Sequence, residues 1–411
     1  MRIATSQIYE HNSSRLMSLQ ERVIKLNQMI SSENRVSTPS DDPIAAAQIE
    51  LMSQRINSTL LLQKNRQAAE SSLTLQDGIL GDTSSSLQRL REIQLQAGNS
   101  ALSESDRKAL ATEAKVLLNQ MQDLANTRDS AGNFMFSGGQ SGTQAISINS
   151  AGQYIYAGDS TQRFQGVTGS LQIAISDTGD NVFMRIPNGN GKFTINNTAT
   201  PNTGTAAVSS GSVVNAGAYV PDNYTMSFAS NSSGQTVVMV SGVSSGNVIP
   251  PTGLVDDAPL YHENEAITFN GMSMTVTGAP MAGDSFSIAP SQNESVFSTV
   301  QRMIANLGKP YGSAEEKAAT QTENNQLLDQ LDSALTNILD VRADVGARLN
   351  QLTSAYNTNI SLIDASVEAM ASLQKIDSYA VASEYALQVL NLQVAQQSFA
   401  RIQGLSLFNY I

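Results

Sequence analysis

Two adjacent carboxylates, Asp41 and Asp42, lie between Pro39 and Pro43 and are of a residue type that could do chemistry. Paired carboxylates can form an acid–base pair or half of a metal site. They can also begin a helix, because the residue before a proline avoids helical dihedrals and proline suits the first helical position. No third polar partner accompanies the pair. We therefore interpret Asp41, Asp42 and Pro43 as a helix cap and as a hinge between a terminal helix and a folded helical domain.

The other candidates for catalysis or metal binding are incomplete motifs. The chain has two histidines, His11 and His262, and no cysteine. "HENEA" (262–266) begins like a zinc-binding helix, but Ala266 stands where the second histidine would be, so we interpret it as a polar loop. "NGNGKF" (188–193) and "SDTGDN" (176–181) lack residues that phosphate and calcium loops need, and we interpret both as β-turns. We predict no enzymatic activity and no catalytic, metal-binding or cofactor-binding residue.

The composition excludes several classes of partner. A net charge of −12 repels a phosphate backbone, so we predict no nucleic-acid partner. No segment approaches the roughly 18 apolar residues of a transmembrane helix, and the N-terminus lacks a continuous apolar stretch. We predict neither membrane insertion nor a cleavable secretory signal. With 411 residues, the chain is long enough for two or three domains.

Helical periodicity occupies the N-terminal third. One seam has alternating spacings of three and four, with a single polar interruption: Tyr9, Asn12, Leu16, Leu19, Val23, Leu26 and Ile30. A long helix is predicted from Pro43 to about Ala97, with a buried stripe of Ala69, Leu73, Leu80, Leu87 and Leu90. Gly98 ends this pattern, and Ser103 with Asp106 predicts a capped restart.

The C-terminal third has the most regular pattern. Thirteen positions keep a four–three spacing: Leu331, Leu335, Ile338, Arg342, Val345, Leu349, Leu352, Tyr356, Asn359, Ile363, Ser366, Met370 and Leu373. A phase shift near Ile376 is expected to unwind or overwind the helix locally. A final helix is predicted to carry one apolar face, made of Val381, Tyr385, Val389, Leu392, Phe399 and Ile402. A shorter helix is expected between Val296 and Leu307, followed by a capping box of Ser313 and Glu316.

Between residues 137 and 290 the pattern changes to short alternating apolar runs separated by Gly, Asn and Asp, which indicates strands and tight turns. We therefore predict an α+β fold: a discontinuous, coiled-coil-like bundle of long helices from both ends, with a β-rich insertion in the middle. The predicted divisions are terminal assembly helices (1–41 and 376–411), a helical bundle domain (42–136 and 291–375) and the β-rich insertion domain (137–290).

The terminal helices lack an obvious core within the chain, so we predict that they are buried against other molecules. The predicted assembly interface comprises Leu16, Leu19, Val23, Leu26, Ile30, Val381, Tyr385, Val389, Leu392, Phe399 and Ile402.

Five segments carry a resemblance to a known family. They are "MRIAT" with Tyr9, "RVSTPSDDPIAAAQ" (35–48), "ANTRDSAGNFMFSG" (125–138), "YIYAGD" (154–159) and "ARIQGLSLFNYI" (400–411). Together they resemble the hook-associated protein 3 family of bacterial flagella, within the flagellin superfamily. Flagellins usually lack the prolines that flank the acidic pair, and the closing segment also favours the hook-associated family.

The resemblance implies a structural adaptor that joins the flagellar hook to the filament as a ring of identical subunits. It implies hook-associated protein 1, flagellin and a flagellar export chaperone as partners. It also implies type III export, without a cleaved signal, to the extracellular hook–filament junction, and no cofactor.

Two other hypotheses stay open on the sequence alone. The chain could be flagellin, the filament subunit, or a secreted binding or enzymatic protein that acts through its β-rich insertion.

Overall fold

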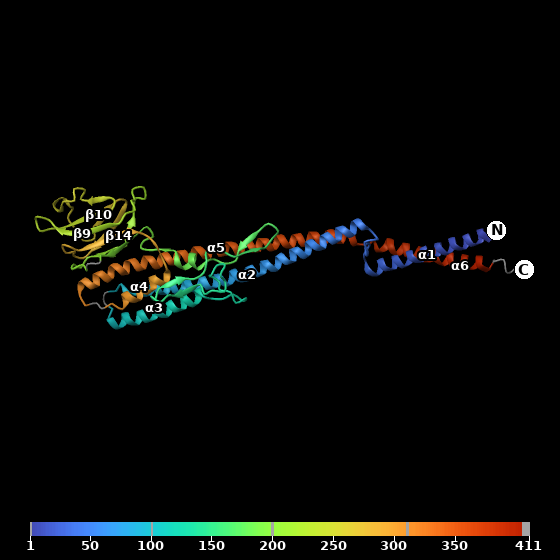
Figure 1. Cartoon of the computed structure of the whole chain (residues 1–411), viewed down its shortest axis with the longest axis horizontal. Helices are drawn as coiled ribbons and strands as arrows, with labels where there is room; N and C mark the ends of the chain where they lie inside the picture. Colours follow the sequence, from blue (N-terminus) through green and yellow to red (C-terminus); the bar gives the residue numbers. More distant parts are fainter. Residues whose placement is uncertain (1, 100–101, 199–200, 310–311, 405–411) are drawn as a thin grey trace. The chain divides into compact units, whose positions relative to one another are not determined.

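The computed structural model describes residues 2–99, 102–198, 201–309 and 312–404, and it confirms the predicted α+β class. Long helices come from the two ends of the chain and short strands from its middle (Figure 1). The α-helices of the described residues are α1 (Arg2–Ser32), α2 (Pro43–Ala97), α3 (Glu104–Ala125), α4 (Val296–Leu307), α5 (Ala314–Gln374) and α6 (Ser378–Gly404).

The strands are short, and most lie in two sheets. One sheet has the order β11-β10-β9-β14-β6, and the other has the order β12-β13-β7, with β8 also paired to β13. The strands of these sheets are β6 (Phe193–Asn197), β7 (Ala207–Val208), β8 (Ser212–Val213), β9 (Tyr224–Ser230), β10 (Thr236–Gly242), β11 (Gly246–Ile249), β12 (Ala266–Phe269), β13 (Met272–Thr277) and β14 (Ser285–Pro290). The others are β1 (Ile146–Ile148), β2 (Tyr154–Tyr156), β3 (Phe164–Gly166), β4 (Gln172–Ala174), β5 (Ile186–Pro187) and β15 (Asn293–Glu294).

The chain forms two compact units. The first contains Met1–Arg66, Gly166–Leu171 and Ser354–Ile411, and the second contains Gln67–Gln165 and Gln172–Thr353. The boundaries between them fall inside α2 and α5, so each of these long helices contributes residues to both units. The three-domain division inferred from the sequence stays a prediction.

In the first unit, α1 and α6 lie side by side, drawn in blue and red in Figure 1. A break separates α5 from α6 close to Ile376, where the sequence predicted a phase shift followed by a final helix. At this break the Arg35 N–H donates to the Gln374 carbonyl at 2.6 Å, and Asn34 pairs with Lys375. The Asp377 carboxylate then accepts the amides of Tyr379 and Ala380 at 3.1 Å, which starts α6 as a new helix.

The buried face of α5 differs in part from the predicted seam. Every seventh residue from Leu331 to Ser366 is buried, as the pattern predicts, whereas Leu373 is half-buried: the buried residues are Leu331, Ile338, Val345, Leu352, Asn359 and Ser366. The second buried row lies three residues after the first, at Ala334, Val341 and Ala355, and not four residues after it. Residues three and four apart both lie on one helix face. At two of the three positions the buried side chain is a small alanine, and Tyr356 is exposed.

The helices of the second unit begin and end largely where the sequence placed them. The predicted stripe of α2 is buried from Ala69 to Leu90. Ser103 and Asp106 form the predicted capping box of α3, and Ser313 with Glu316 forms the one before α5. The α4 residue Phe297 stacks on Tyr154 of β2, with ring centroids 5.0 Å apart.

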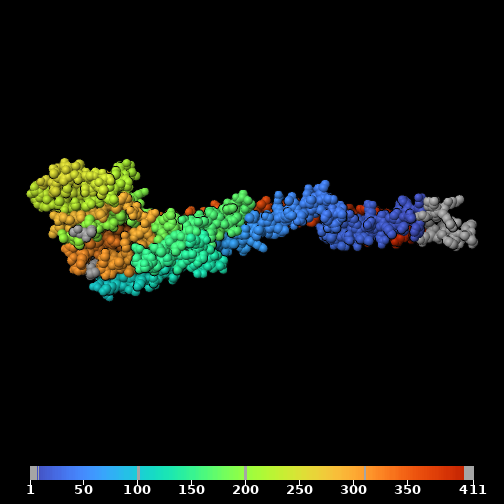
Figure 2. All heavy atoms as spheres, viewed as in Figure 1, coloured from blue at the N-terminus to red at the C-terminus, as the bar shows by residue number. Residues whose placement is uncertain are grey.

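The two larger sheets lie in residues 193–290, here called the strand lobe, and share one hydrophobic core. In β9, Tyr224, Met226 and Phe228 are buried while the alternate side chains are not, as the twofold period of a strand requires. Phe286 of the first sheet and Met274 of the second belong to the same buried cluster. Figure 2 shows the lobe, mostly in yellow, as a closely packed body of side chains.

Helix α5 covers two edges of these sheets. The Gln326 side-chain oxygen lies 3.3 Å from the amide of Ile195 on β6, and the Thr322 hydroxyl accepts the amide of Val208 on β7 at 3.1 Å. Asn325 donates to the Val208 carbonyl at 3.0 Å. An unpaired sheet edge is a template for another strand, so these contacts protect β6 and β7.

Candidate assembly interface

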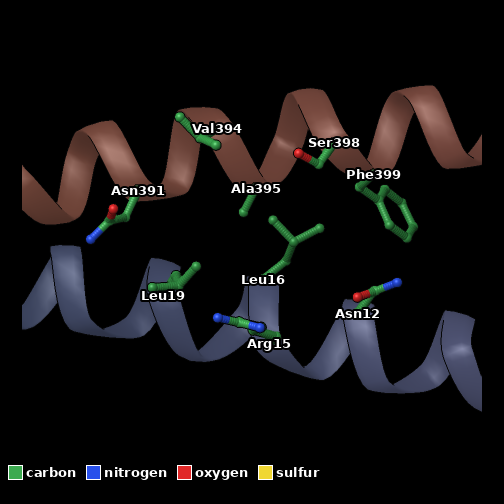
Figure 3. Close-up of a pocket in the computed structure, with 9 residues that line it drawn as sticks. All are labelled: Asn12, Arg15, Leu16, Leu19, Asn391, Val394, Ala395, Ser398 and Phe399. Atoms are coloured by element: carbon green, nitrogen blue, oxygen red, sulfur yellow. The ribbon is translucent and has the colours of Figure 1, made fainter.

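The predicted interface residues lie on α1 and α6, which pair through their apolar seams. Neither helix has a broad apolar face, so neither can form a core alone. Leu16 and Leu19 of α1 point toward α6, and Ala395 and Phe399 of α6 point toward α1 (Figure 3). The rings of Tyr9 and Phe399 lie 5.4 Å apart. The pairing therefore gives the terminal helices an intramolecular partner that the sequence analysis did not anticipate.

The pairing buries the predicted residues only in part. Leu26 is buried, and the other described members of the set are half-buried: Leu16, Leu19, Val23, Ile30, Val381, Tyr385, Val389, Leu392 and Phe399. Ile402 lies in α6, but its side chain is outside the described residues. Their role in assembly stays a prediction.

A cavity of about 400 Å³ opens between the two helices (Figure 3). Polar groups from both helices, Asn12, Arg15, Asn391 and Ser398, line it together with apolar side chains. Asn12 is the polar interruption of the predicted seam. Two paired helices with such an opening are incompletely packed, since well-packed protein interiors leave few voids larger than a water molecule.

A second apolar row on α6 is mostly exposed and was missed by the sequence analysis, and one of its members, Val394, also lines the cavity between the two helices. Leu387, Leu390 and Val394 are 58 %, 55 % and 54 % exposed, with spacings of three and four. On α1, Met17 and Ile24 are also exposed and lie one heptad apart. The periodicity alone could have revealed the α6 row, but the stronger seam on the same helix obscured it. Each terminal helix therefore presents apolar side chains on two faces.

The acidic pair lies between α1 and α2 and makes the contacts of a helix start. The Ala45 N–H donates to the Asp42 carboxylate at 3.0 Å, directly before α2 begins at Pro43. Arg35 donates to the same carboxylate at 3.1 Å. Asp41 accepts the amides of Ser37 and Thr38 at 3.1 and 2.9 Å. Both carboxylates thus organise the turn between the helices, and the hinge role stays a prediction.

These contacts also fix the charge of the pair. The Lys25 ammonium, 2.8 Å from Asp41, and the amides of Thr38 and Ser37 hold the pKa of Asp41 well below its ordinary value. The amide of Ala45 and the guanidinium of Arg35 lower the pKa of Asp42. Both side chains are therefore charged at neutral pH. Neither has the raised pKa that would suit a general acid.

A buried ion pair in the second unit was missed because its members are far apart in the sequence. The segment "SDTGDN" was interpreted as a β-turn, but it leads into a π-helical turn (Asp180–Met184), and Asp177 within it is buried. Arg348 donates two hydrogen bonds to Asp177, at 2.7 and 2.9 Å. Gln76 and Gln162 donate to the same carboxylate at 2.7 and 2.9 Å. The network ties α2, α5 and the segment before the π-turn together.

The remaining motifs show no catalytic arrangement. In "HENEA", residues 262–265 form an exposed turn before β12. Residues 242–246, "GVSSG", match the pattern of a nucleophile elbow that the sequence analysis did not identify, but they join β10 to β11, whereas an elbow joins a strand to a helix. The amides of Ser244 and Ser245 donate to Asp222 there. In the part of the chain that the structure describes, no three His, Asp or Glu residues are grouped so that they could hold a metal ion, and no helix is long and apolar enough to span a membrane.

Comparisons with known proteins identify relatives along the whole chain. The family model "Bacterial flagellin N-terminal helical region" matches residues 3–141. Flagellar hook-associated protein 3 of Escherichia coli (strain K12) is 24 % identical over 409 residues, 99 % of each chain. The crystal structure of flagellar hook-associated protein 3 from Legionella pneumophila is 66 % identical, with a TM-score of 0.78, and the match covers 79 % of this chain and 98 % of that one. The flagellar junction protein FlgL from Legionella pneumophila is also 66 % identical, with a TM-score of 0.75 and coverage of 80 % and 99 %.

Proposed function

We propose, from the premise that this chain belongs to the flagellar hook-associated protein 3 family, that its terminal helices join it to neighbouring subunits of the flagellum. The chain is a junction protein between the flagellar hook and filament, and so a structural component of the flagellum. The flagellin-like N-terminal region supports the alternative, a filament subunit, only weakly. Self-polymerisation of the purified chain into long filaments would favour that alternative.

The observation that carries the assembly proposal is the double apolar character of α1 and α6. Their pairing half-buries one seam and leaves Leu387, Leu390 and Val394 of α6 mostly exposed. Apolar rows at heptad-like spacing are stable when a second helix covers them. A ring of copies, each laying a terminal helix on this row of the next copy, would cover it. The cavity between α1 and α6 would then be closed by side chains of a neighbouring copy.

The specific partners and the route of export are part of the same proposal. Hook-associated protein 1 would lie on one side of the ring and flagellin on the other. The chain would leave the cell through the flagellar type III apparatus, with a chaperone on its C-terminal helix, and would act outside the cell. Terminal helices that are covered only on assembly suit a subunit that must stay exportable, because their ordering entropy is then offset by the contacts of the assembled state. The chain would have no catalytic activity.

A single charge on the exposed row tests this proposal. Leu390→Glu should leave the fold intact, because the side chain is mostly exposed, but should place an unpaired charge in the subunit interface. Gln393→Glu is the matched control, since it adds one charge at another exposed position of the same helix.

The assay is filament formation in cells whose own copy is deleted and replaced by each variant. The proposal predicts normal filaments with Gln393→Glu and few or none with Leu390→Glu, while both purified proteins keep the same circular dichroism and melting temperature. Normal filaments with Leu390→Glu would refute the use of this row in assembly.

A further inference from the structure

The strand lobe contains a sheet edge, at β12, to which no further strand of the described chain is paired. Strand β12 is the last strand of its sheet, while α5 protects the edges at β6 and β7. Edge strands present unpaired N–H and C=O groups to solvent and are templates for an added strand. Strand β12 therefore differs from the protected edges in having its backbone available.

The register shows which backbone groups are free. Ala266 lies opposite Thr275 of β13, and Thr268 lies opposite Ser273. Both backbone groups of Thr275 form hydrogen bonds to Ser209, which lies on the side of β13 away from β12. The Thr275 carbonyl accepts the Ser209 amide at 3.0 Å, and the Thr275 amide donates to the Ser209 hydroxyl at 3.0 Å. The Ala266–Thr275 pair is therefore not hydrogen-bonded across the ladder, and by alternation neither is the Thr268–Ser273 pair. The N–H and C=O groups of Ala266 and Thr268 point to the open edge.

A cavity lined by both apolar and polar side chains lies beside this edge. It has a volume of about 170 Å³ and is lined by Ala266, Ile267 and Thr268 of β12, and by Val238, Ile249 and Leu260 from the other side. Leu260 is partly exposed there. A cavity of this size accommodates one aliphatic side chain. Strand addition uses this combination, with main-chain bonds for affinity and a side-chain pocket for selectivity.

The charge of the lobe selects the kind of strand that would bind. From Phe193 to Pro290 the sequence contains six carboxylates and neither lysine nor arginine. Glu265 lines the cavity, and Asp256, Asp257 and Glu263 lie within the ten residues that end at Glu265. With no cationic residue in the lobe to pair with them, these carboxylates attract cations and repel phosphate.

We propose that the strand lobe binds an extended, cationic peptide segment, which adds to the edge of β12 and places one aliphatic side chain in the adjacent cavity. Its lysine or arginine side chains then face Glu265 and the neighbouring carboxylates. The inference is independent of the assembly proposal, because it uses neither α1 nor α6.

The probe is a fluorescent, end-blocked peptide of alternating lysine and valine, titrated with the full chain and followed by fluorescence anisotropy. A peptide of alternating glutamate and valine is the control for strand propensity without cationic charge. The lysine peptide should bind saturably and more weakly as salt is added, and the glutamate peptide should not bind. On binding, the amides of Ala266 and Thr268 should exchange with deuterium more slowly.

Three variants separate strand addition from diffuse charge attraction. Thr268→Pro removes an outward N–H without removing a ladder bond and should weaken binding by about tenfold. Glu265→Gln should weaken it by about two- to fivefold. Asp257→Asn, which removes a carboxylate outside the cavity lining, should have a smaller effect than Glu265→Gln.

Absence of saturable binding, or equal binding of both peptides, would overturn the proposal. The proposal would also be overturned if Glu265→Gln and Asp257→Asn weakened peptide binding equally and amide exchange at β12 did not change on binding. Because the exchange measurement uses the unmodified chain, the test stands even where Thr268→Pro disturbs the fold.

Discussion

Replacing Asp177 by Asn should strongly destabilise the second compact unit. The side chains of Asp177 and Arg348 are only 4 % and 17 % exposed, and the carboxylate accepts four hydrogen bonds, two from Arg348 and one each from Gln76 and Gln162. Asn has nearly the same shape, but its amide nitrogen would point a donor at other donors, and the Arg348 charge would lose its partner. Removing one member of a buried ion pair typically costs about 3–5 kcal/mol.

The assay is urea-induced unfolding of the full chain, followed by far-UV circular dichroism, with thermal unfolding as a second measure. For a unit of about 280 residues, this loss corresponds to a decrease of roughly 5–8 °C in melting temperature. Glu92→Gln is the matched control, because its pair with Arg89 is 61 % and 41 % exposed and should change stability by less than about 1 kcal/mol.

A double variant tests the reason for the loss. Replacing Asp177 by Leu and Arg348 by Met removes both charges together, so neither is left unpaired, and this double variant should be more stable than Asp177→Asn. A cost below about 1 kcal/mol for Asp177→Asn, equal to that of the exposed control, would refute the assignment of a buried, stability-determining pair.

Three further predictions concern the helices. The pKa of Asp41 and of Asp42 is lower in the folded chain than the ordinary 3.8, so their contribution to stability is fully present above that pH and is lost as the pH falls through the folded values. A variant with both Asp41→Asn and Asp42→Asn should therefore be less stable than the parent at neutral pH and equally stable in acid. A difference in stability that persists below the folded pKa values would contradict the charge argument. Phe399→Ala removes an aromatic contact worth about 0.5–1.5 kcal/mol and should speed amide exchange along α1 and α6 while leaving the strand lobe unchanged; unchanged exchange in α1 would argue against the pairing. Ile338→Ala should cost about 2–5 kcal/mol in urea unfolding, because the side chain is buried on α5, whereas Leu339→Ala, 44 % exposed, should cost less than half as much; equal costs would contradict the assigned face.

The sequence predicted the helices well because their periodicity is local. A heptad beginning at Leu331 was sufficient to identify one buried row of α5, and Ser103 with Asp106 was sufficient to place the start of α3. The second buried row was misplaced by one residue, because spacings of three and four both fit one helix face. Which of them is buried depends on the neighbouring elements, and at Ala334 a small residue is buried while the larger Leu335 is not fully buried.

Long-range contacts were beyond the sequence patterns. Asp177 and Arg348 are 171 residues apart, and nothing in "SDTGDN" distinguishes a buried carboxylate from a turn residue. The short strands of residues 137–290 were recognisable from alternation, but their pairing order depends on contacts between segments far apart, such as β6 with β14. The break between α5 and α6 is stabilised by the pairing of Asn34 with Lys375, which a pattern near Ile376 could not reveal.

The most direct test of the central claim is deletion of the gene, followed by electron microscopy of the flagella and measurement of flagellin in the medium. A junction protein predicts complete hooks without filaments, together with flagellin shed as unpolymerised subunits. The chain itself, supplied from a plasmid, should restore filaments, and the Leu390→Glu variant should not. Normal filaments in the deletion strain, or hooks that fail to form, would contradict the assignment.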